Sequence, residues 1–230
     1  MSSPEDTEPV ELLDTLLERV GQRIEDERDH LTELDSKIGD ADFGMNLHRG
    51  CQSALDAVEA LEDPSPTEFV STIGETLLEE MAGSSGIIFG RSLMVASEEL
   101  DEELSVDSVA AFAEAFRETV EDLGEVDVGA KTMYDVVVPV THALRASTNT
   151  EEHGPLQSSA RAVEAARRGA MFTTALRAKR GRASYTEWRS VGNPDPGAVG
   201  TYMILSVIHE VLEDEVGERC SPGFDDEFDS

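Results

Sequence analysis

Cysteine, lysine and aromatic residues are scarce in this sequence, and the shortage of cysteine excludes whole classes of protein. Its two cysteines, Cys51 and Cys220, lie far apart and show no C-x-x-C or Cys/His ligand spacing. Neither a zinc site nor a disulfide framework is therefore expected. The sequence also lacks a long apolar run, and its polar start, MSSPEDTEPV, lacks the basic and apolar regions of an export signal. We expect a cytoplasmic chain with reduced thiols and no membrane association.

Positive charge is also scarce relative to negative charge. Eighteen Lys and Arg residues stand against 49 Asp and Glu, giving a formal net charge of −31, and only three of the cations are lysine. Such a surface repels nucleic acids and anionic membranes, so neither is expected as a partner. Replacement of lysine by carboxylates is typical of proteins from halophilic organisms, where salt screens the self-repulsion.

Apolar residues make up 39% of the chain and recur mainly at the 3.6-residue spacing of helices. No strand pattern is convincing, and Val136–Val138 is better interpreted as part of a helix with a kink at Pro139. The short connections predict an all-α fold of eight antiparallel amphipathic helices in a closed up-and-down barrel over residues 1–215, followed by an acidic tail over 216–230. The expected helices are 8–34, 44–61, 67–81, 86–100, 106–122, 132–147, 156–178 and 197–215.

The loops at the two ends of such a barrel differ in composition. The second, fourth and sixth loops are acidic or proline-bearing, whereas the first, third, fifth and seventh hold most of the glycines at helix boundaries. Alternate loops of an up-and-down bundle emerge at the same end. We therefore expect the functional site on the rim formed by the odd-numbered loops.

Three carboxylates, Asp35, Asp40 and Asp42, lie within eight residues in the first rim loop. The first precedes Gly39, and the other two lie between Gly39 and Gly44. Clustered carboxylates repel one another unless they share a cation, and an oxygen-only ligand set favours Mg²⁺ or Ca²⁺. The spacing is not that of an EF-hand. A solvated loop that caps a helix is the alternative interpretation, since acidic residues are common in this chain.

The other rim loops offer groups that suit an anion. Ser84 and Ser85 precede a helix and would point backbone N–H groups at a phosphate, although a plain serine cap is the alternative. Eight cations and two anions lie between Arg161 and Arg189. In this basic segment, Arg182 follows a glycine and could bind a phosphate in bidentate fashion. Together these features favour a site for a metal-bound nucleotide di- or triphosphate.

Four segments in this order also resemble a known family: LDSKIGDADFGMNLHRG, AGSSGIIFG, GAKTMYDVVVP and RGRASYTEWRSVGNPDPGA. They are similar to the ADP-binding L subunit (DhaL) of dihydroxyacetone kinase, whose fold is an eight-helix barrel with nucleotide on one rim. The resemblance implies two Mg²⁺ ions held by Asp35, Asp40 and Asp42, and a catalytic, phosphate-contacting Arg182. It implies ADP or ATP bound by Phe43, Gly44, Met45, Asn46, Ser84, Ser85, Gly124, Met133, Arg182, Asp195, Pro196 and Gly197. Ala41, Phe43 and Ala130 depart from the usual glycine, histidine and aspartate of the family.

The resemblance further implies a phosphotransferase subunit of glycerol metabolism, acting on dihydroxyacetone (glycerone) held covalently by a separate K subunit. A phosphohistidine-bearing M subunit would recharge the bound ADP in phosphoenolpyruvate phosphotransferase-system versions, and a homodimer is compatible with the sequence. One alternative is an ATP-dependent dihydroxyacetone kinase subunit. Another is an interaction protein that senses Mg-nucleotide without turnover. A fatty-acid kinase domain is disfavoured, because such chains carry further domains.

Overall fold

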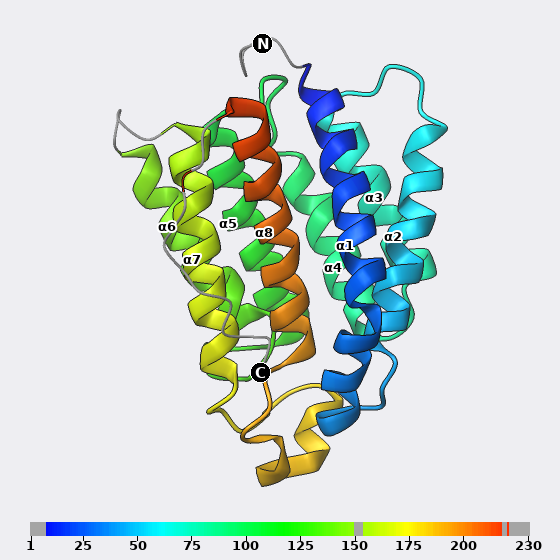
Figure 1. The fold of residues 1–230 in the computed structure, drawn as a ribbon, viewed down its shortest axis with the longest axis vertical. Helices are drawn as coiled ribbons and strands as arrows, with labels where there is room; N and C mark the ends of the chain where they lie inside the picture. Colours follow the sequence, from blue (N-terminus) through cyan, green and yellow to red (C-terminus); the bar gives the residue numbers. More distant parts are fainter. Residues whose placement is uncertain (1–7, 150–153, 218–219, 221–230) are drawn as a thin grey trace.

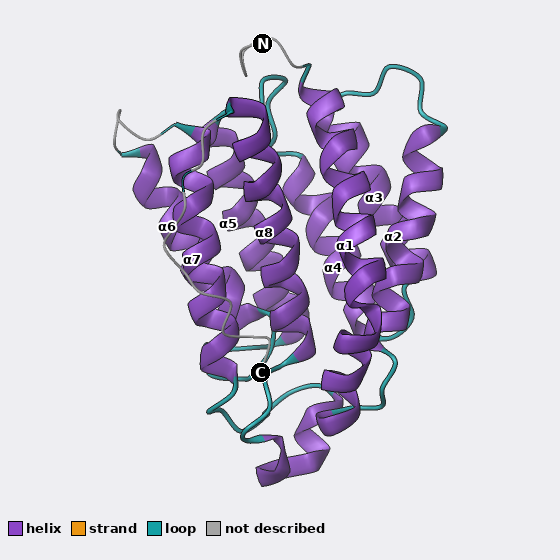
Figure 2. Ribbon diagram, in the orientation of Figure 1, coloured by secondary structure: helices purple, strands orange, loops and turns teal. Residues whose placement is uncertain are grey.

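The computed structural model describes residues 8–149, 154–217 and 220, and this part of the chain is helical with no strand. The α-helices are α1 (Pro9–Ile38), α2 (Phe43–Glu59), α3 (Pro66–Glu80), α4 (Ser84–Ser97), α5 (Val106–Gly124), α6 (Tyr134–Thr148), α7 (Pro155–Thr173) and α8 (Pro196–Val216). A 3₁₀ segment, η1 (Arg182–Ser190), lies between α7 and α8. The all-helical prediction is confirmed (Figure 2).

Helix starts follow from local chemistry. A proline occupies the start of α1, α3, α7 and α8, where its missing N–H is not needed and its fixed φ suits the helix. Ser65, Ser105 and Asp195 precede α3, α5 and α8, and each side chain accepts a hydrogen bond from a backbone N–H in the first turn.

Consecutive helices run in opposite directions and pack side by side (Figure 1). Each helix contacts the next in the chain, and α8 also contacts α1, where Arg23 pairs with Glu210 at 3.0 Å. The apolar faces point inward and bury side chains such as Ile24, Leu31 and Val207. In the described residues no helix has both the length and the apolar character needed to cross a membrane.

Two helix ends differ from the sequence prediction by more than three residues, and the others differ by less. The first helix continues to Ile38 instead of ending at residue 34, because no glycine or proline lies between Leu34 and Gly39 and Ile38 is itself buried. The seventh helix ends at Thr173, earlier than residue 178, and η1 forms in the connection that follows. The expected tail over 216–230 lies largely outside the described residues, except that Cys220 donates from its backbone N–H to Glu213 at 2.7 Å.

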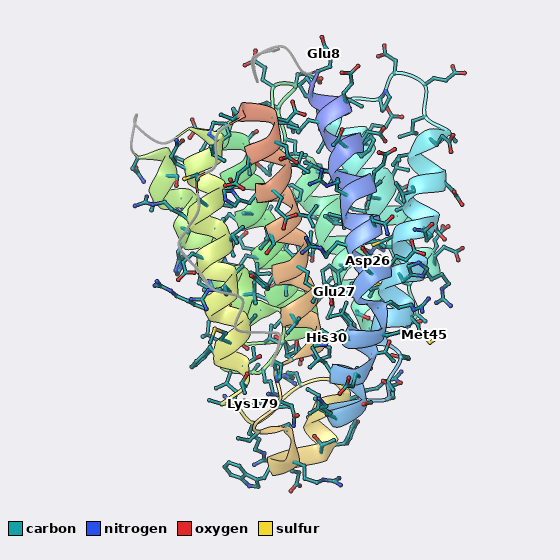
Figure 3. All side chains as sticks on the ribbon, in the orientation of Figure 1. Glu8, Asp26, Glu27, His30, Met45 and Lys179 are labelled. Carbon is teal, nitrogen blue, oxygen red and sulfur yellow. The ribbon has the colours of Figure 1, made fainter. Side chains whose placement is uncertain are left out.

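All four odd-numbered connections lie at one end of the bundle, the lower end in Figure 1, with η1 below the end of α1. Figure 3 shows Met45 and Lys179 towards this end and Glu8 at the opposite end. We call this end the rim. It comprises loops 39–42, 81–83, 125–133 and 174–195, with the helix turns that adjoin them.

Candidate functional site

The three predicted carboxylates meet at the α1–α2 connection. One oxygen from each of Asp35, Asp40 and Asp42 lies within 4.8 Å of the others. Asp35 is a buried residue in the last turn of α1, not a loop residue, and its Oδ2 accepts from the N–H groups of Asp42 (2.9 Å) and Phe43 (3.2 Å). Asp35 therefore serves as the cap of α2, and its Oδ1 remains available to a ligand.

Arg182 at the start of η1 lies against this cluster. Its guanidinium contacts the Asp40 carboxylate and lies 3.6 Å from that of Asp42. The sequence separates these residues by about 140 positions, so the contact depends on the whole bundle bringing α1 and η1 together. The cation next to the carboxylates offsets part of their mutual repulsion.

The first turn of α2 is mostly structural. Phe43 packs in the main core, and Asn46 is buried with its side-chain oxygen accepting from Arg49 at 3.3 Å. A Cβ at Gly44 would lie 2.2 Å from the Arg28 carbonyl oxygen, so this glycine allows α1 and α2 to approach closely. Met45 alone of the predicted residues in this turn points to solvent, with 61% of its surface exposed.

Ser84 and Ser85 are the first two residues of α4. Gly83 precedes them with φ +86°, and no side chain caps the helix there. The N–H groups of this turn consequently face the rim without a capping side chain, as a phosphate-binding helix start requires. Gly124 ends α5, and the residue after it, Glu125, adopts the left-handed conformation.

The α5–α6 loop is organised by one carboxylate, Asp135, which accepts from the N–H groups of Gly129 (2.5 Å), Lys131 (2.9 Å) and Thr132 (3.1 Å). The Lys131 side chain is 1% exposed, and its ammonium donates to the carbonyl oxygens of Thr173 (2.6 Å) and Asn193 (2.5 Å). Burial lowers the pKa of Lys131. Two rim loops are thereby joined through one side chain.

Asp195, Pro196 and Gly197 start α8 beside Met133, which is buried. A Cβ on Gly197 would lie 3.9 Å from that of Met133. Desolvation raises the pKa of Asp195 to about 7, opposed by the hydrogen bond from the Ala198 N–H and by Lys131. The chain thus gathers Met133 and the Asp195–Gly197 turn at one place on the rim.

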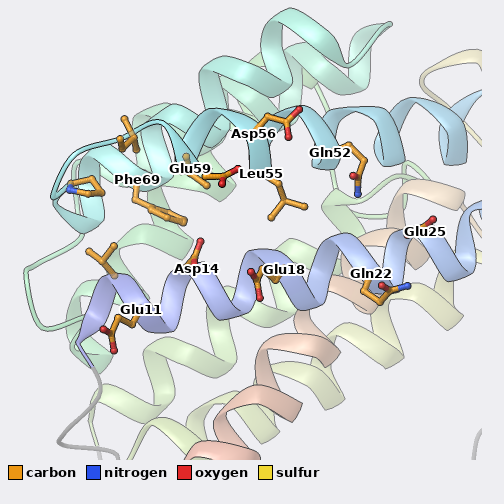
Figure 4. A pocket seen from close by; sticks show the side chains of 14 residues that line it. Glu11, Asp14, Glu18, Gln22, Glu25, Gln52, Leu55, Asp56, Glu59 and Phe69 are labelled. Atoms are coloured by element: carbon orange, nitrogen blue, oxygen red, sulfur yellow. The ribbon is translucent and has the colours of Figure 1, made fainter.

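A separate groove of about 740 Å³ runs between α1 and α2, toward the end opposite the rim (Figure 4). Leu55 and Phe69 contribute its apolar wall, and its carboxylates are Glu11, Asp14, Glu18, Glu25, Asp56 and Glu59. Among the described residues, no basic side chain lines it. Such a groove repels phosphate, so it is a poor nucleotide site.

Comparison with known proteins now identifies the family. Residues 37–210 match the DAK2 domain. The chain is 33% identical over 195 residues to the PEP-dependent dihydroxyacetone kinase ADP-binding subunit DhaL of Escherichia coli (strain K12), covering 84% of this chain and 92% of that protein. This chain belongs to the DAK2 domain family. The resemblance noted in the sequence is thereby confirmed.

Some other relatives are much longer. Human triokinase/FMN cyclase is 33% identical over 199 residues, which are 86% of this chain but 34% of that protein. Among solved structures, the dihydroxyacetone kinase from C. freundii in complex with AMP-PNP and Mg²⁺ superposes with a TM-score of 0.66 at 25% identity. The match covers 86% of this DAK2 chain and 33% of the kinase chain.

Sequence reasoning missed Lys131 and Asp135 as organisers of the rim. Two features could have drawn attention to these residues. Lys131 is one of only three lysines in the chain, and Asp135 stands in the first turn of a helix. A lysine within an acidic chain has many surface carboxylates to pair with, so nothing in the sequence showed that its partners are backbone carbonyls from the α7–α8 connection.

Proposed function

We propose that this chain is the nucleotide-binding subunit of a dihydroxyacetone kinase, a cytoplasmic phosphotransferase. ADP or ATP would bind at the rim with two Mg²⁺ ions, and the γ-phosphoryl group would pass to dihydroxyacetone held on a separate K subunit. The observation that carries this proposal is the meeting of Asp35, Asp40 and Asp42 with Arg182 on the rim. Membership of the DAK2 family and the names of its relatives support it.

The donor set fits magnesium. Three carboxylates provide only oxygen ligands, and the described residues around them include no cysteine or histidine ligand in the same cluster. Asp40 and Asp42 would provide most of the ligating oxygens, because one oxygen of Asp35 already accepts two backbone N–H groups. When bound, the ions would neutralise charge on the nucleotide phosphates during transfer.

The remaining rim residues would hold the nucleotide. The N–H groups at Ser84 and Ser85 suit a phosphate, and Gly124 and Met133 would lie on the adenine side. The turn at Asp195, Pro196 and Gly197 would close the site. Phe43, Gly44, Met45 and Asn46 would also contact the bound nucleotide, and Gly44 lets α1 and α2 approach closely there.

Arg182 would contact the transferred phosphoryl group. A guanidinium donates in a planar fork that matches phosphate oxygens, and it stabilises charge that develops during transfer. Its position beside Asp40 and Asp42 puts it within reach of any phosphate bound to metal ions at those carboxylates. The residues of this chain thus supply positioning and charge stabilisation, on which phosphoryl transfer chiefly depends.

Exposed apolar side chains support docking of a protein partner over the rim. The large hydrophobic residues that are exposed in the described part of the chain are Met45, Ile87, Val95, Leu123, Val128, Met171, Phe172, Tyr185, Trp188 and Val191. All except Val95 lie in rim loops or adjoining helix turns. Apolar surface gathered at one end of an acidic protein favours a binding face. We assign it to the K subunit, with Tyr185 and Trp188 on the basic segment as expected contacts.

The phosphoryl donor distinguishes the versions of this function. The names of bacterial relatives favour a phosphoenolpyruvate-dependent system, in which a phosphohistidine-bearing M subunit recharges bound ADP. An ATP-dependent subunit, and a Mg-nucleotide sensor without turnover, would use the same rim residues. Homodimer formation is compatible with each version.

Identification of any nucleotide that the chain retains through purification tests the proposal. The chain should be purified at high salt, denatured, and its released ligand identified by mass spectrometry. Stoichiometric ADP would support the phosphoenolpyruvate-dependent version, in which the nucleotide stays bound. No retained nucleotide, together with no calorimetric binding of Mg-ADP or Mg-ATP, would contradict a nucleotide-binding role.

A further inference from the structure

The connection between α7 and α8 is a loop with a fixed neck. At its two ends, the Lys131 ammonium binds the carbonyl oxygens of both Thr173 and Asn193. The Gly192 N–H donates to the Thr174 carbonyl at 2.8 Å, and this bond joins the two chain segments that form the neck directly. A loop closed in this way can move at its tip while its ends stay in place.

The tip of this loop, η1, is exposed and carries aromatic residues. Tyr185 is 85% exposed and Trp188 is 71% exposed. Gly181 and Gly192 flank η1 with φ of +62° and +93°, and a Cβ at either position would meet nothing within 4 Å. These glycines are therefore required by backbone conformation and not by packing, as expected for points about which the tip can pivot.

Arg182 joins this tip to the carboxylates of the α1–α2 loop. Its guanidinium contacts Asp40 and lies 3.6 Å from Asp42, while the side chain itself remains 58% exposed. Carboxylate lone pairs that accept from a guanidinium are not free to ligate a cation. An ion pair this exposed contributes little stability, so a divalent cation can displace it at small cost.

We propose that Arg182 is a latch that competes with divalent cations for Asp40 and Asp42. Metal binding displaces the guanidinium, frees the tip of the loop and makes Arg182 available to a phosphate. This inference rests on the proposed function, because it takes the carboxylates to be metal ligands. It goes further in assigning Arg182 two opposite effects on affinity. Arg182 weakens the binding of the metal ion alone and strengthens the binding of the metal-nucleotide.

Measuring both affinities in an Arg182→Ala variant tests the latch. Arg182→Ala should bind Mn²⁺ alone about two- to fivefold more tightly than wild type, the range expected for loss of an exposed ion pair. The same variant should bind Mg-ADP more weakly, because the phosphate loses a charge-assisted hydrogen bond. Free Mn²⁺ is measured by electron paramagnetic resonance, and Asp40→Asn defines the background from other surface carboxylates.

Arg180→Ala is the matched control. Arg180 lies two residues away on the same loop and pairs with Glu125 at 3.8 Å, so its removal changes the net charge equally. A latch predicts little change in Mn²⁺ affinity for this variant, whereas a general field effect predicts the same increase at both positions. Equal increases in the two variants, or no increase in Arg182→Ala, would overturn the latch.

Trp188 gives a second readout from within η1. It is the single tryptophan of the chain, and the Arg177 guanidinium lies 5.3 Å from the centre of its ring. Mg²⁺, which unlike Mn²⁺ does not itself quench tryptophan, should change its fluorescence in wild type and Arg180→Ala but not in Arg182→Ala, where the latch contact is already lost. A wild-type protein that binds Mg-ADP and shows no such difference contradicts the latch alone. Failure of wild type to bind Mg-ADP at all contradicts the proposed function.

Discussion

The ammonium of Lys131 donates a 2.5 Å hydrogen bond to the carbonyl oxygen of Asn193, 62 residues further along the chain. Through this contact and a second one to Thr173, the α5–α6 loop fixes the connection that carries Arg182. The geometry of the candidate site therefore depends on the buried Lys131 ammonium. Its hydrogen-bond partners among the described residues are backbone carbonyl oxygens and not carboxylates.

Replacement of Lys131 by methionine should destabilise the protein. Lys131→Met leaves two carbonyl oxygens without their donor, which we expect to lower the free energy of unfolding by about 2–4 kcal/mol. Urea denaturation followed by circular dichroism measures the change. Lys179→Met is the control, because Lys179 is exposed and its substitution should stay within about 0.5 kcal/mol. Equal stability of Lys131→Met and Lys179→Met would show that the contacts of Lys131 are dispensable.

Asp40→Asn and Asp42→Asn should each weaken Mg-ADP binding about tenfold or more while helical content stays unchanged. A neutral amide replaces a ligand charge that offsets dehydration of the metal ions. Calorimetric titration with Mg-ADP provides the affinity. Asp56→Asn removes the same charge from the exposed surface of α2 in the distant groove and should leave the affinity unaltered. Wild-type affinity in both rim variants would rule out the metal assignment.

Asp195 should make stability depend on pH. Its pKa rises from 3.8 to about 7 on folding, so the folded state keeps a proton that the unfolded state releases. The protonated carboxyl favours the folded state at low pH, and this contribution disappears as pH rises from about 4 to about 7. Asp195→Asn keeps a side chain able to cap α8 and removes the ionisation.

The variant should therefore gain stability relative to wild type across that range, on the order of 2 kcal/mol. Chemical denaturation of both proteins at several pH values measures the difference. A constant difference between pH 4 and 7 would show that the carboxyl titrates normally.

Salt should stabilise this chain. With a net charge of −31, repulsion between surface carboxylates falls as the Debye length shrinks from about 10 Å at 0.1 M salt to about 3 Å at 1 M. We expect the midpoint of thermal unfolding to rise by several degrees over this range of KCl. A midpoint that is constant or falls would show that the acidic surface is not limiting stability.

Much of the fold follows from local sequence patterns. Apolar residues at helical spacing and short connections were enough to predict eight helices and to assign alternate loops to one end. The predicted end of the first helix was wrong because polar residues after Leu34 resemble a loop, whereas Ile38 packs in the core and extends the helix.

The site was harder to predict because its contacts join distant parts of the chain. The Asp35, Asp40 and Asp42 cluster is local and was visible as a sequence pattern. The contact between Arg182 and Asp40 needs the packing of η1 on α1, and η1 itself has too few residues for a clear periodicity. The burial of Lys131 likewise depends on loops that meet only in the folded bundle.

Formation of dihydroxyacetone phosphate by this chain, with and without a matching K subunit, tests the central claim most directly. The rim offers carboxylates and an arginine but no histidine in the acidic cluster that could hold the substrate covalently. A free substrate forgoes effective molarities that can reach about 10⁵ M. The proposed function predicts negligible product from the isolated chain with Mg-ATP and steady product once the K subunit is added. Equal rates with and without that subunit, or no product from the complete mixture with a phosphoryl donor, would contradict it.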